Sequence, residues 1–262
     1  MEILHILAGG FVGFVIGLTG VGGGSFMTPI LVLGFGISPA IAVGTDLLYA
    51  SITKSGGVLF HQSHRTIDWR IVTLLCTGSI PASISTIVVL DSLKTTGFDI
   101  DNTINSTLSF MLILTALVII FKGYILSRLH TSVGDNRDHY IALLKLRPAI
   151  TLFVGLLLGI LVTISSVGAG AIGAAILFLL YPNKPSINIV GTDLAHAVPL
   201  TAIAGLGHMH YGSVDFALLT GLLAGGVPAI YLGSLVGKKL PDKILRPLVA
   251  ALLLGLGIRF AL

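Results

Sequence analysis

Residues 42–60 read AVGTDLLYASITKSGGVLF, an apolar stretch that is long enough to cross a bilayer and yet contains Asp46 and Lys54. A hydrocarbon core of about 30 Å requires about 20 apolar residues in a helix. An ionised carboxylate inside such a helix costs about 2.5 kcal/mol or more on insertion scales, so Asp46 needs a cavity, a partner or a proton. The stretch therefore predicts a membrane helix that carries a functional position.

The composition extends this interpretation to the whole chain. Of the 262 residues, 54% are hydrophobic and only 10% are charged, with a mean hydropathy of +1.01. This leaves too little polar surface for a soluble domain, so we predict an all-α integral membrane protein whose partner is the lipid bilayer. The pI is near 9.3, but the basic residues lie singly or in short clusters without interleaved aromatic residues, and we expect no nucleic-acid partner.

Apolar runs recur from one end of the chain to the other. Two of the predicted segments, 25–37 and 169–181, are short and follow glycine clusters, so we interpret them as halves of broken helices. The first run lacks a basic region and a cleavage site, so it is not expected to be a signal peptide. We predict ten transmembrane segments, at residues 3–19, 25–37, 40–60, 70–90, 104–122, 149–164, 169–181, 186–208, 215–237 and 244–261.

The two halves of the chain resemble each other. The motif GTDL at residues 44–47 recurs at residues 191–194, and the same offset of 147 positions pairs His61 with His208 and Asp68 with Asp215. Each unit holds five segments, an odd number, so the second unit enters the membrane from the opposite face. Inverted repeats of this kind are typical of transporters. We predict two inverted five-helix repeats, 1–122 and 149–262, joined by a linker at 123–148.

The distribution of Lys and Arg predicts the orientation. Cytoplasmic connections are rich in these residues, and an N-terminus outside the cell places most of them on the cytoplasmic face. The linker at 123–148 then lies in the cytoplasm, and the protein lies in the cell (inner) membrane.

Three motifs, in this order and spacing, carry a family resemblance: GVGGGS at residues 20–25 leading to Pro29, AVGTD at 42–46, and IDW at 67–69 after a short basic loop. The chain resembles the TauE/SafE family of sulfite and organosulfonate exporters over nearly its whole length. In the second half Ala169 interrupts the glycine cluster and Ala175 stands where Pro29 stands in the first. The resemblance implies a prokaryotic inner-membrane carrier for a small sulfur-containing anion.

The glycine clusters are candidate anion sites. Backbone N–H groups at the start of a half-helix can approach a ligand closely, and the positive end of the helix dipole favours an anion. Close helix packing is the alternative, and for Gly9, Gly13 and Gly17 at four-residue spacing we expect packing. With the residues around Asp46, the predicted substrate-binding residues are Gly22, Gly23, Gly24, Ser25, Thr45, Asp46, Lys54, Gly168, Gly170 and Thr192.

Asp46, Asp193 and His196 are the predicted ion-coupling residues. His196 follows Asp193 by three positions, on the same helix face, which favours a protonatable pair. The alternative role for the aspartates is to cap a helix break near Gly44 or Gly191, with Thr45 or Thr192 assisting. Lys54 could provide a counter-charge for an anion, or extend its ammonium toward the cytoplasmic end of its helix.

Other polar residues have simpler interpretations. His61 and His208 are expected at the membrane interface, and Asp68 and Asp215 are expected to cap the helices that follow them. No metal is predicted, because the histidine pairs fall on opposite membrane faces, and no cofactor is predicted.

These features together predict a membrane transporter, an exporter working by alternating access at a midplane site, and not an enzyme. Three alternatives remain open: a carrier that couples a cation such as sodium to another small anion, an intramembrane aspartyl enzyme, and a structural subunit. The chain has no HExxH or GxSxG motif that would favour an enzyme. The sequence leaves open which anion is moved, in which direction and with which coupling ion, and a homo-oligomer is compatible with it.

Overall fold

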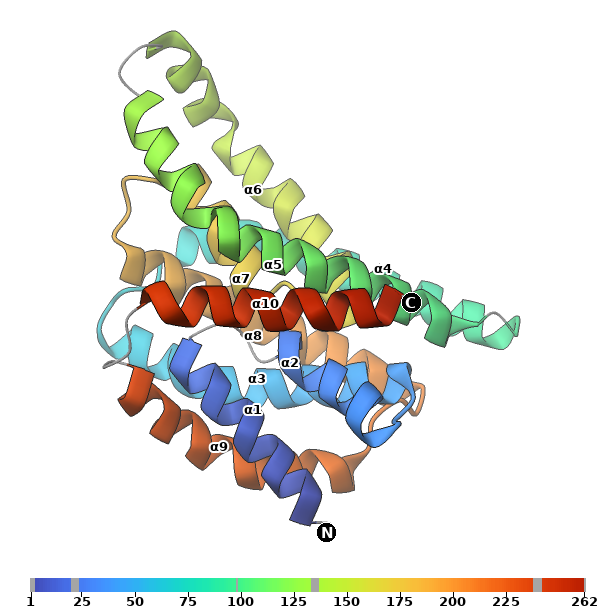
Figure 1. Cartoon of the computed structure of the whole chain (residues 1–262). Helices are drawn as coiled ribbons and strands as arrows, with labels where there is room; N and C mark the ends of the chain where they lie inside the picture. Colours follow the sequence, from blue (N-terminus) through green and yellow to red (C-terminus); the bar gives the residue numbers. More distant parts are fainter. Residues whose placement is uncertain (1–2, 20–23, 98, 133–136, 238–241, 262) are drawn as a thin grey trace.

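Helices make up almost all of the chain, and no strand occurs in the part that the structure describes (Figure 1). The structure is a computed structural model that describes residues 3–19, 24–97, 99–132, 137–237 and 242–261. The elements within these ranges are α1 (Ile3–Thr19), α2 (Gly24–Pro29), the π-helical turn η1 (Ile30–Gly34), α3 (Pro39–Ser63), α4 (Trp69–Thr95), α5 (Ile100–Ser132), α6 (Arg137–Ser165), α7 (Ala171–Leu180), α8 (Ser186–His210), α9 (Phe216–Gly237) and α10 (Asp242–Ala261).

Local sequence determines where several helices begin. Pro39 occupies the first turn of α3, where its missing N–H leaves no bond unmade. The carboxylate of Asp68 accepts hydrogen bonds from the backbone N–H groups of Arg70 and Ile71, at 3.1 and 3.3 Å, and so caps α4. The carboxylate of Asp215 accepts one from Leu218 N at 2.9 Å. The predicted capping roles of both aspartates are confirmed.

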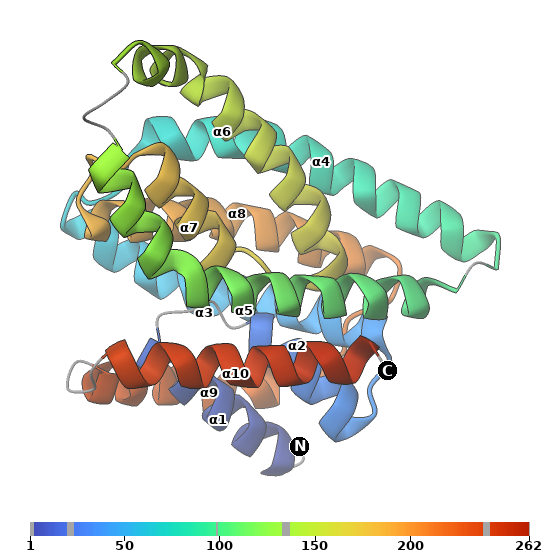
Figure 2. The same ribbon diagram turned by 45° about the horizontal axis from the view of Figure 1, so that its top comes forward.

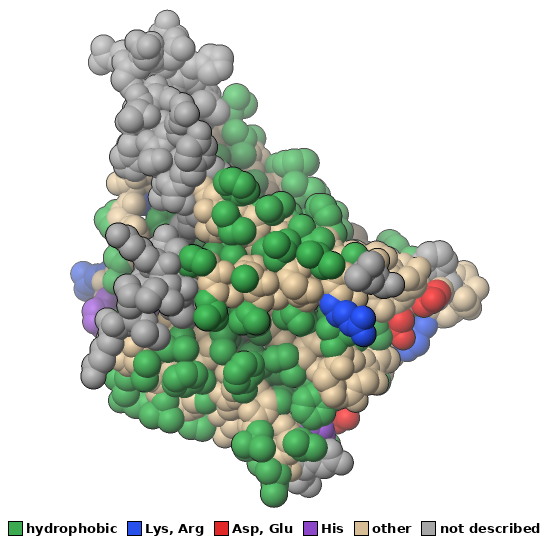
Figure 3. Space-filling view, in the orientation of Figure 1, with side chains coloured by type: hydrophobic (Ala, Val, Ile, Leu, Met, Phe, Trp, Pro, Cys, Tyr) green, Lys and Arg blue, Asp and Glu red, His purple; other side chains and the backbone are tan. Residues whose placement is uncertain are grey.

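Several helices are long and apolar enough to cross a bilayer by themselves, as expected of a multi-pass membrane protein. Large apolar side chains such as Leu59, Phe153 and Leu232 are more than half exposed. In Figure 3 hydrophobic side chains are spread over the whole described surface in view, and the few charged ones lie toward its edges. Within the described residues the five spanning candidates are Trp69–Thr95, Ile100–Phe121, Leu146–Ser165, Ser186–His210 and Phe216–Val236.

The remaining apolar helices are shorter. α7 has ten residues, which at 1.5 Å per residue gives about 15 Å, half of a hydrocarbon core. α2 passes directly into η1, and the two together end at Gly34. Both of the segments that we interpreted as broken helices, 25–37 and 169–181, are therefore short. Gly22 and Gly23 lie outside the described residues.

Glycines allow two pairs of helices to pack with their backbones in contact. A Cβ atom on Gly13 of α1 would lie 2.4 Å from the carbonyl oxygen of Gly226 in α9, and one on Gly9 or Gly17 would meet the same helix as closely. α6 packs on α4 in the same way, where a Cβ on Gly155 would lie 2.3 Å from Leu75 O. The packing role predicted for the glycine stripe of α1 is confirmed.

α3 and α8 pack against each other, and they run antiparallel. The start of α3, at Gly44, contacts the segment that ends α8, while the start of α8, at Gly191, contacts His61 near the end of α3. Where the two helices cross, Ser51 Oγ lies 3.5 Å from Val198 O. α3 has 25 residues but is not among the five spanning candidates, and its interior carries Asp46 and Lys54.

The predicted linker at 123–148 is largely helical. α5 continues to Ser132 and α6 begins at Arg137. These ends of α5 and α6 project together beyond the other helices (Figures 1 and 2). Residues 133–136 and the side chains of residues 122–145 lie outside the described part of the chain.

Candidate functional site

Both Gly-Thr-Asp motifs lie inside unbroken helices. α3 runs from Pro39 to Ser63 and α8 from Ser186 to His210, so neither helix stops near its motif. The alternative in which Asp46 or Asp193 caps a helix break near Gly44 or Gly191 is therefore wrong. An aspartate in a helix interior has its backbone bonded within the helix, so its carboxylate is available for other contacts.

The threonines of the two motifs exchange hydrogen bonds between the halves of the chain. Thr45 Oγ1 accepts a hydrogen bond from Asp215 N at 3.1 Å, and Thr192 Oγ1 accepts one from Asp68 N at 2.9 Å. Each threonine thus holds the residue that caps a helix of the other half. These predicted substrate-binding residues have their hydroxyl oxygens occupied by backbone N–H groups.

The glycines of the two motifs contact the paired histidines. A Cβ on Gly44 would lie 2.0 Å from Ser213 O and 2.9 Å from His208 Cβ, and one on Gly191 would lie 2.6 Å from His61 Nδ1. His61 and His208 are buried, with 8% and 0% of their surface exposed. Protein atoms therefore cover both histidines, and their expected position at the membrane interface stays a prediction. In the sequence, the offset of 147 that relates the two motifs also pairs these two histidines, which indicated that they occupy equivalent places in the two halves.

Asp46 is completely buried and faces polar groups from two other segments. Thr28 Oγ1, from α2, donates a hydrogen bond of 2.6 Å to Asp46 Oδ2. The hydroxyl of Ser166, just after α6, approaches the carboxyl group closely enough to interact with it. Neither Ser166 Oγ nor Asp46 Oδ1 has a formed hydrogen bond among the described residues. Sequence reasoning missed both Thr28 and Ser166, which flank the two glycine clusters.

Lys54 points into the protein. Only 8% of it is exposed, and its Nζ donates a hydrogen bond of 2.9 Å to Ala169 O, in the glycine cluster of the second half. Its ammonium also interacts electrostatically with the carboxylates of Asp193 and Asp46. The alternative in which Lys54 extends toward the cytoplasmic end of its helix is therefore wrong. A lysine from the first half links both motifs to the second glycine cluster.

Asp193 and His196 are both buried within α8. The Asp193 carboxylate packs on α7, where a Cβ on Gly173 would lie 2.1 Å from Oδ1. His196 Nε2 lies 2.9 Å from Ser79 Oγ in α4, and its Nδ1 has no hydrogen-bond partner among the described residues. Asp193 interacts electrostatically with Lys54. His196, by contrast, makes its hydrogen bond to Ser79 of α4.

The second glycine cluster forms the loop between α6 and α7. Gly168 and Gly170 have φ angles of +119° and +127°, which side chains rarely adopt, so glycine is required there. This conformation presents the carbonyl of Ala169 to Lys54. In the first half, Gly24 begins α2 and Ser25 is buried. Nowhere in the described residues do three His, Cys, Asp or Glu side chains converge as metal ligands.

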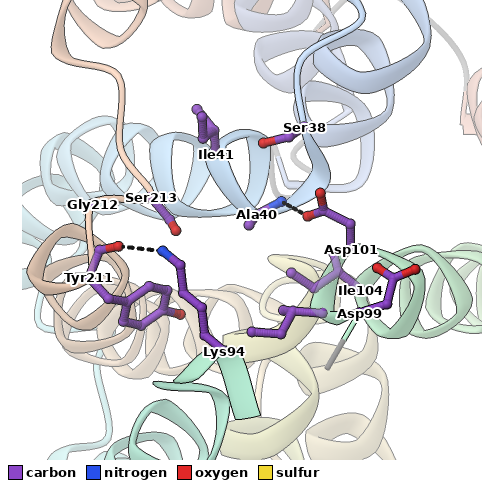
Figure 4. A pocket seen from close by; sticks show the side chains of 11 residues that line it. Ser38, Ala40, Ile41, Lys94, Asp99, Asp101, Ile104, Tyr211, Gly212 and Ser213 are labelled. Carbon is purple, nitrogen blue, oxygen red and sulfur yellow. Dashed lines mark hydrogen bonds between the residues drawn. The ribbon is translucent and has the colours of Figure 1, made fainter. Parts of the chain in front are cut away.

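A pocket of about 350 Å³, here called the rim pocket, opens where α3 and α5 begin and α4 and α8 end (Figure 4). Lys94 Nζ, on its wall, donates to Tyr211 O at 2.9 Å. Asp101 Oδ1, on another wall, accepts a hydrogen bond of 3.2 Å from Ala40 N. Ser213, also in the lining, is the residue whose carbonyl contacts Gly44. The pocket therefore lies over the start of the helix that carries Asp46 and Lys54.

An ion pair lies beyond the other end of α3. Lys184 Nζ is 2.7 Å from Asp68 Oδ2. Burial acts to raise the pKa of Asp68, but the hydrogen bond and charge of Lys184, together with the N–H groups of Ile71 and Arg70, outweigh it and hold that pKa below its ordinary value. The ion pair connects the segment after α3 to the segment before α8, the two helices that carry the Gly-Thr-Asp motifs.

The fold combines apolar helices of spanning length with short helices between them, and it buries two carboxylates and an ammonium together. These features define the class of α-helical membrane transporters. Comparison with known proteins agrees. The family model for the sulfite exporter TauE/SafE matches residues 5–260, and the chain belongs to this family.

Relatives in bacteria and archaea match along nearly their whole length. The chain is 37% identical over 259 residues to the Bacillus subtilis protein described as probable membrane transporter protein YjnA, covering 99% of both chains. It is 28% identical to probable membrane transporter protein MJ0441 of Methanocaldococcus jannaschii, covering 97% of this chain and 93% of that one. No solved structure matches with significant similarity.

Proposed function

We propose that the protein exports a small sulfur-containing anion, such as sulfite or an organosulfonate, by alternating access at a midplane site. The observation that carries this proposal is the buried Lys54, which contacts the second glycine cluster beside Asp46 and Asp193. Burying an ammonium in a membrane protein costs free energy, so a buried lysine is expected to serve a function. A positive charge in a site of low dielectric constant attracts an anion strongly. The family match supports the transport function.

Two inverted repeats, 1–122 and 149–262 joined by the linker 123–148, would create such a site. Three observations support them. The threonines of the two motifs make equivalent hydrogen bonds to the opposite halves. α3 and α8 run antiparallel. Ser51 and Val198, which are related by the offset of 147, contact each other, as residues on a two-fold axis must. In this arrangement the N-terminus lies outside the cell, and the linker lies on the cytoplasmic side of the inner membrane.

The anion would bind between the glycine clusters and Lys54. In the second half, the ammonium of Lys54 contacts the carbonyl of Ala169, which lies between Gly168 and Gly170 in sequence, and in the first half Gly22, Gly23, Gly24 and Ser25 would supply backbone N–H groups. Thr45 and Thr192 would act indirectly, by holding the motif helices against the opposite half.

Asp46, Asp193 and His196 would couple transport to a proton. All three side chains are buried, and Lys54 interacts with both carboxylates. An intramembrane aspartyl enzyme would instead need two carboxylates that share one proton, whereas here both carboxylates interact with the Lys54 ammonium. A carrier of another small anion, coupled to a cation, is the alternative within the same class.

Flux into proteoliposomes tests the substrate. The purified protein would be offered sulfite, thiosulfate, sulfoacetate, sulfate and simple carboxylates, with protein-free vesicles as the control. The proposal expects saturable flux of a sulfur oxyanion or sulfonate at least about tenfold above that of the carboxylates, because a difference of 1.4 kcal/mol in binding already gives this ratio. Equal flux of all these anions, or flux of carboxylates alone, would contradict it.

A further inference from the structure

We propose that the ammonium of Lys54 occupies a monovalent-cation site, so that the carrier works without sodium, and that replacing Lys54 by threonine turns this place into a sodium site. The inference deepens the proposed function, because it concerns the coupling ion of the same site. Its binding test does not depend on which anion is carried.

The groups around the Lys54 ammonium are those that bind sodium in proteins. Hard cations take oxygen ligands, namely carboxylates, main-chain carbonyls and hydroxyls. Ala169 provides a carbonyl oxygen 2.9 Å from Nζ, in a loop where glycines at 168 and 170 free the backbone from regular helix bonding. Asp193 and Asp46 provide two carboxylates that interact with the same ammonium. In membrane carriers, unwound backbone of this kind beside an acidic residue commonly coordinates a coupling cation.

Two buried oxygens of the cluster have no formed hydrogen bond among the described residues, namely Asp46 Oδ1 and Ser166 Oγ. The hydroxyl of Ser166 nevertheless interacts with the carboxyl group of Asp46. Ser166 is 4% exposed and has a φ angle of +59°, a conformation that is costly for a residue with a side chain. Such strain at a buried hydroxyl, with an open lone pair on the neighbouring carboxylate, is the arrangement expected of cation ligands and not of a satisfied core.

In the second half of the chain, the position equivalent to Lys54 carries no ammonium. The residue equivalent to Lys54 at the offset of 147 is Thr201, which is 1% exposed and whose hydroxyl donates to Ala197 O at 2.9 Å in its own helix. A threonine is therefore accommodated in the interior of a motif helix. Lys54→Thr would remove the ammonium and leave the carboxylates, the Ala169 carbonyl and Ser166 around an empty volume.

Sodium binding tests the inference directly. The purified protein would be unfolded by heat in NaCl and in choline chloride of equal concentration, and binding of radioactive sodium would be measured in parallel, both without any anion substrate of the carrier. Wild type should show the same melting temperature in both salts and no saturable sodium binding. Lys54→Thr should melt at least about 3 °C higher in NaCl and bind sodium saturably, since a ligand that binds only the folded state stabilises it.

Two controls make the result specific. Lys94→Thr removes a lysine from the rim pocket and should create no sodium response. Lys54→Thr combined with Asp46→Asn should lose the response, because the carboxylate is a ligand. Lys54→Ala, which also leaves the volume open, replaces Lys54→Thr if the latter does not fold. Saturable sodium binding to wild type would overturn the inference, as would a folded Lys54→Thr or Lys54→Ala protein that does not respond to sodium.

The transport test separates this inference from the proposed function. Replacing sodium by choline should leave wild-type anion flux unchanged, and loss of flux would contradict the inference while leaving the anion carrier intact. Conversely, absence of sulfur-anion flux in both salts would count against the proposed function, and the sodium-binding measurements would still decide the inference.

Discussion

Lys54 and Ala169, which lie 115 residues apart, are joined by a buried hydrogen bond of 2.9 Å from the ammonium to the carbonyl oxygen. This contact brings the motif helix of the first half to the glycine cluster of the second. Since the Lys54 ammonium also interacts with Asp46 and Asp193, one lysine connects both acidic residues of the candidate site.

Asp46→Asn and Asp193→Asn should insert into the membrane normally and transport at least about tenfold more slowly. Asparagine keeps the shape of the side chain but not its charge, so the partner that it offers Lys54 is weaker. Flux would be compared at equal amounts of reconstituted protein, with Asp99→Asn, at the rim pocket, as the control. Wild-type flux in both variants would leave the two aspartates with a structural role alone.

His196→Ala should remove the pH dependence of transport. His196 is fully buried beside Ser79, and a histidine is the side chain best suited to exchange a proton near neutral pH. Flux would be measured from pH 5.5 to 8.5 in vesicles without a membrane potential. Ser79→Ala should alter the profile as well, since it removes the hydrogen-bond partner of the ring. An unchanged profile in His196→Ala would remove His196 from the coupling mechanism.

Gly44→Ala should destabilise the protein by about 1–3 kcal/mol, because the new methyl group would overpack the contact between the two halves. The Cβ would lie 2.0 Å from Ser213 O, a backbone atom that cannot move aside easily. Gly56→Ala, in the same helix, has nothing within 4 Å of the new atom and should be neutral or slightly stabilising. Thermal unfolding in detergent measures the difference, and equal melting temperatures for the two variants would argue against close contact at Gly44.

Acid should weaken the contact between Asp68 and Lys184. The folded-state pKa of Asp68 is lowered, so its stabilising effect is fully present above the unfolded-state value of about 3.9 and is lost as the pH falls through the lower folded-state pKa. Lys184→Met should reduce the loss of melting temperature between pH 6 and pH 3. The effect should be small, since the two side chains are 24% and 36% exposed. An identical pH dependence in wild type and Lys184→Met would show that the ion pair does not contribute.

Much of the fold follows from local sequence. The length and polarity of the apolar runs predicted where the helices lie, and Asp68 and Asp215 were correctly interpreted as caps because capping depends on neighbouring residues alone. The stripe of Gly9, Gly13 and Gly17 likewise predicted a close packing face. In each case the pattern that predicts the feature lies within a single helix or its first turn.

The candidate site was predicted less completely, because its contacts join residues far apart in sequence. The hydropathy of α3 cannot show which of its faces is turned inward, so the direction of Lys54 was undecided until α8 and the loop at Ala169 were placed beside it. The burial of His61 depends on Gly191, and the role of Thr28 depends on Asp46, for the same reason. The repeated offset of 147 contained part of this information, since equivalent residues meet where the halves cross.

Sulfite flux in Lys54→Met, compared with Lys94→Met, tests most directly whether the buried ammonium serves transport. Both substitutions remove one positive charge, but Lys54 is 8% exposed within the motif cluster, while Lys94 lines the rim pocket. In vesicles that contain equal amounts of folded protein, Lys54→Met should lose at least about tenfold in flux, and Lys94→Met should stay within about twofold of wild type. Wild-type flux in Lys54→Met would contradict the account. Lys54 is the only buried lysine or arginine among the described residues. An anion site that works without it is not the site inferred from this structure.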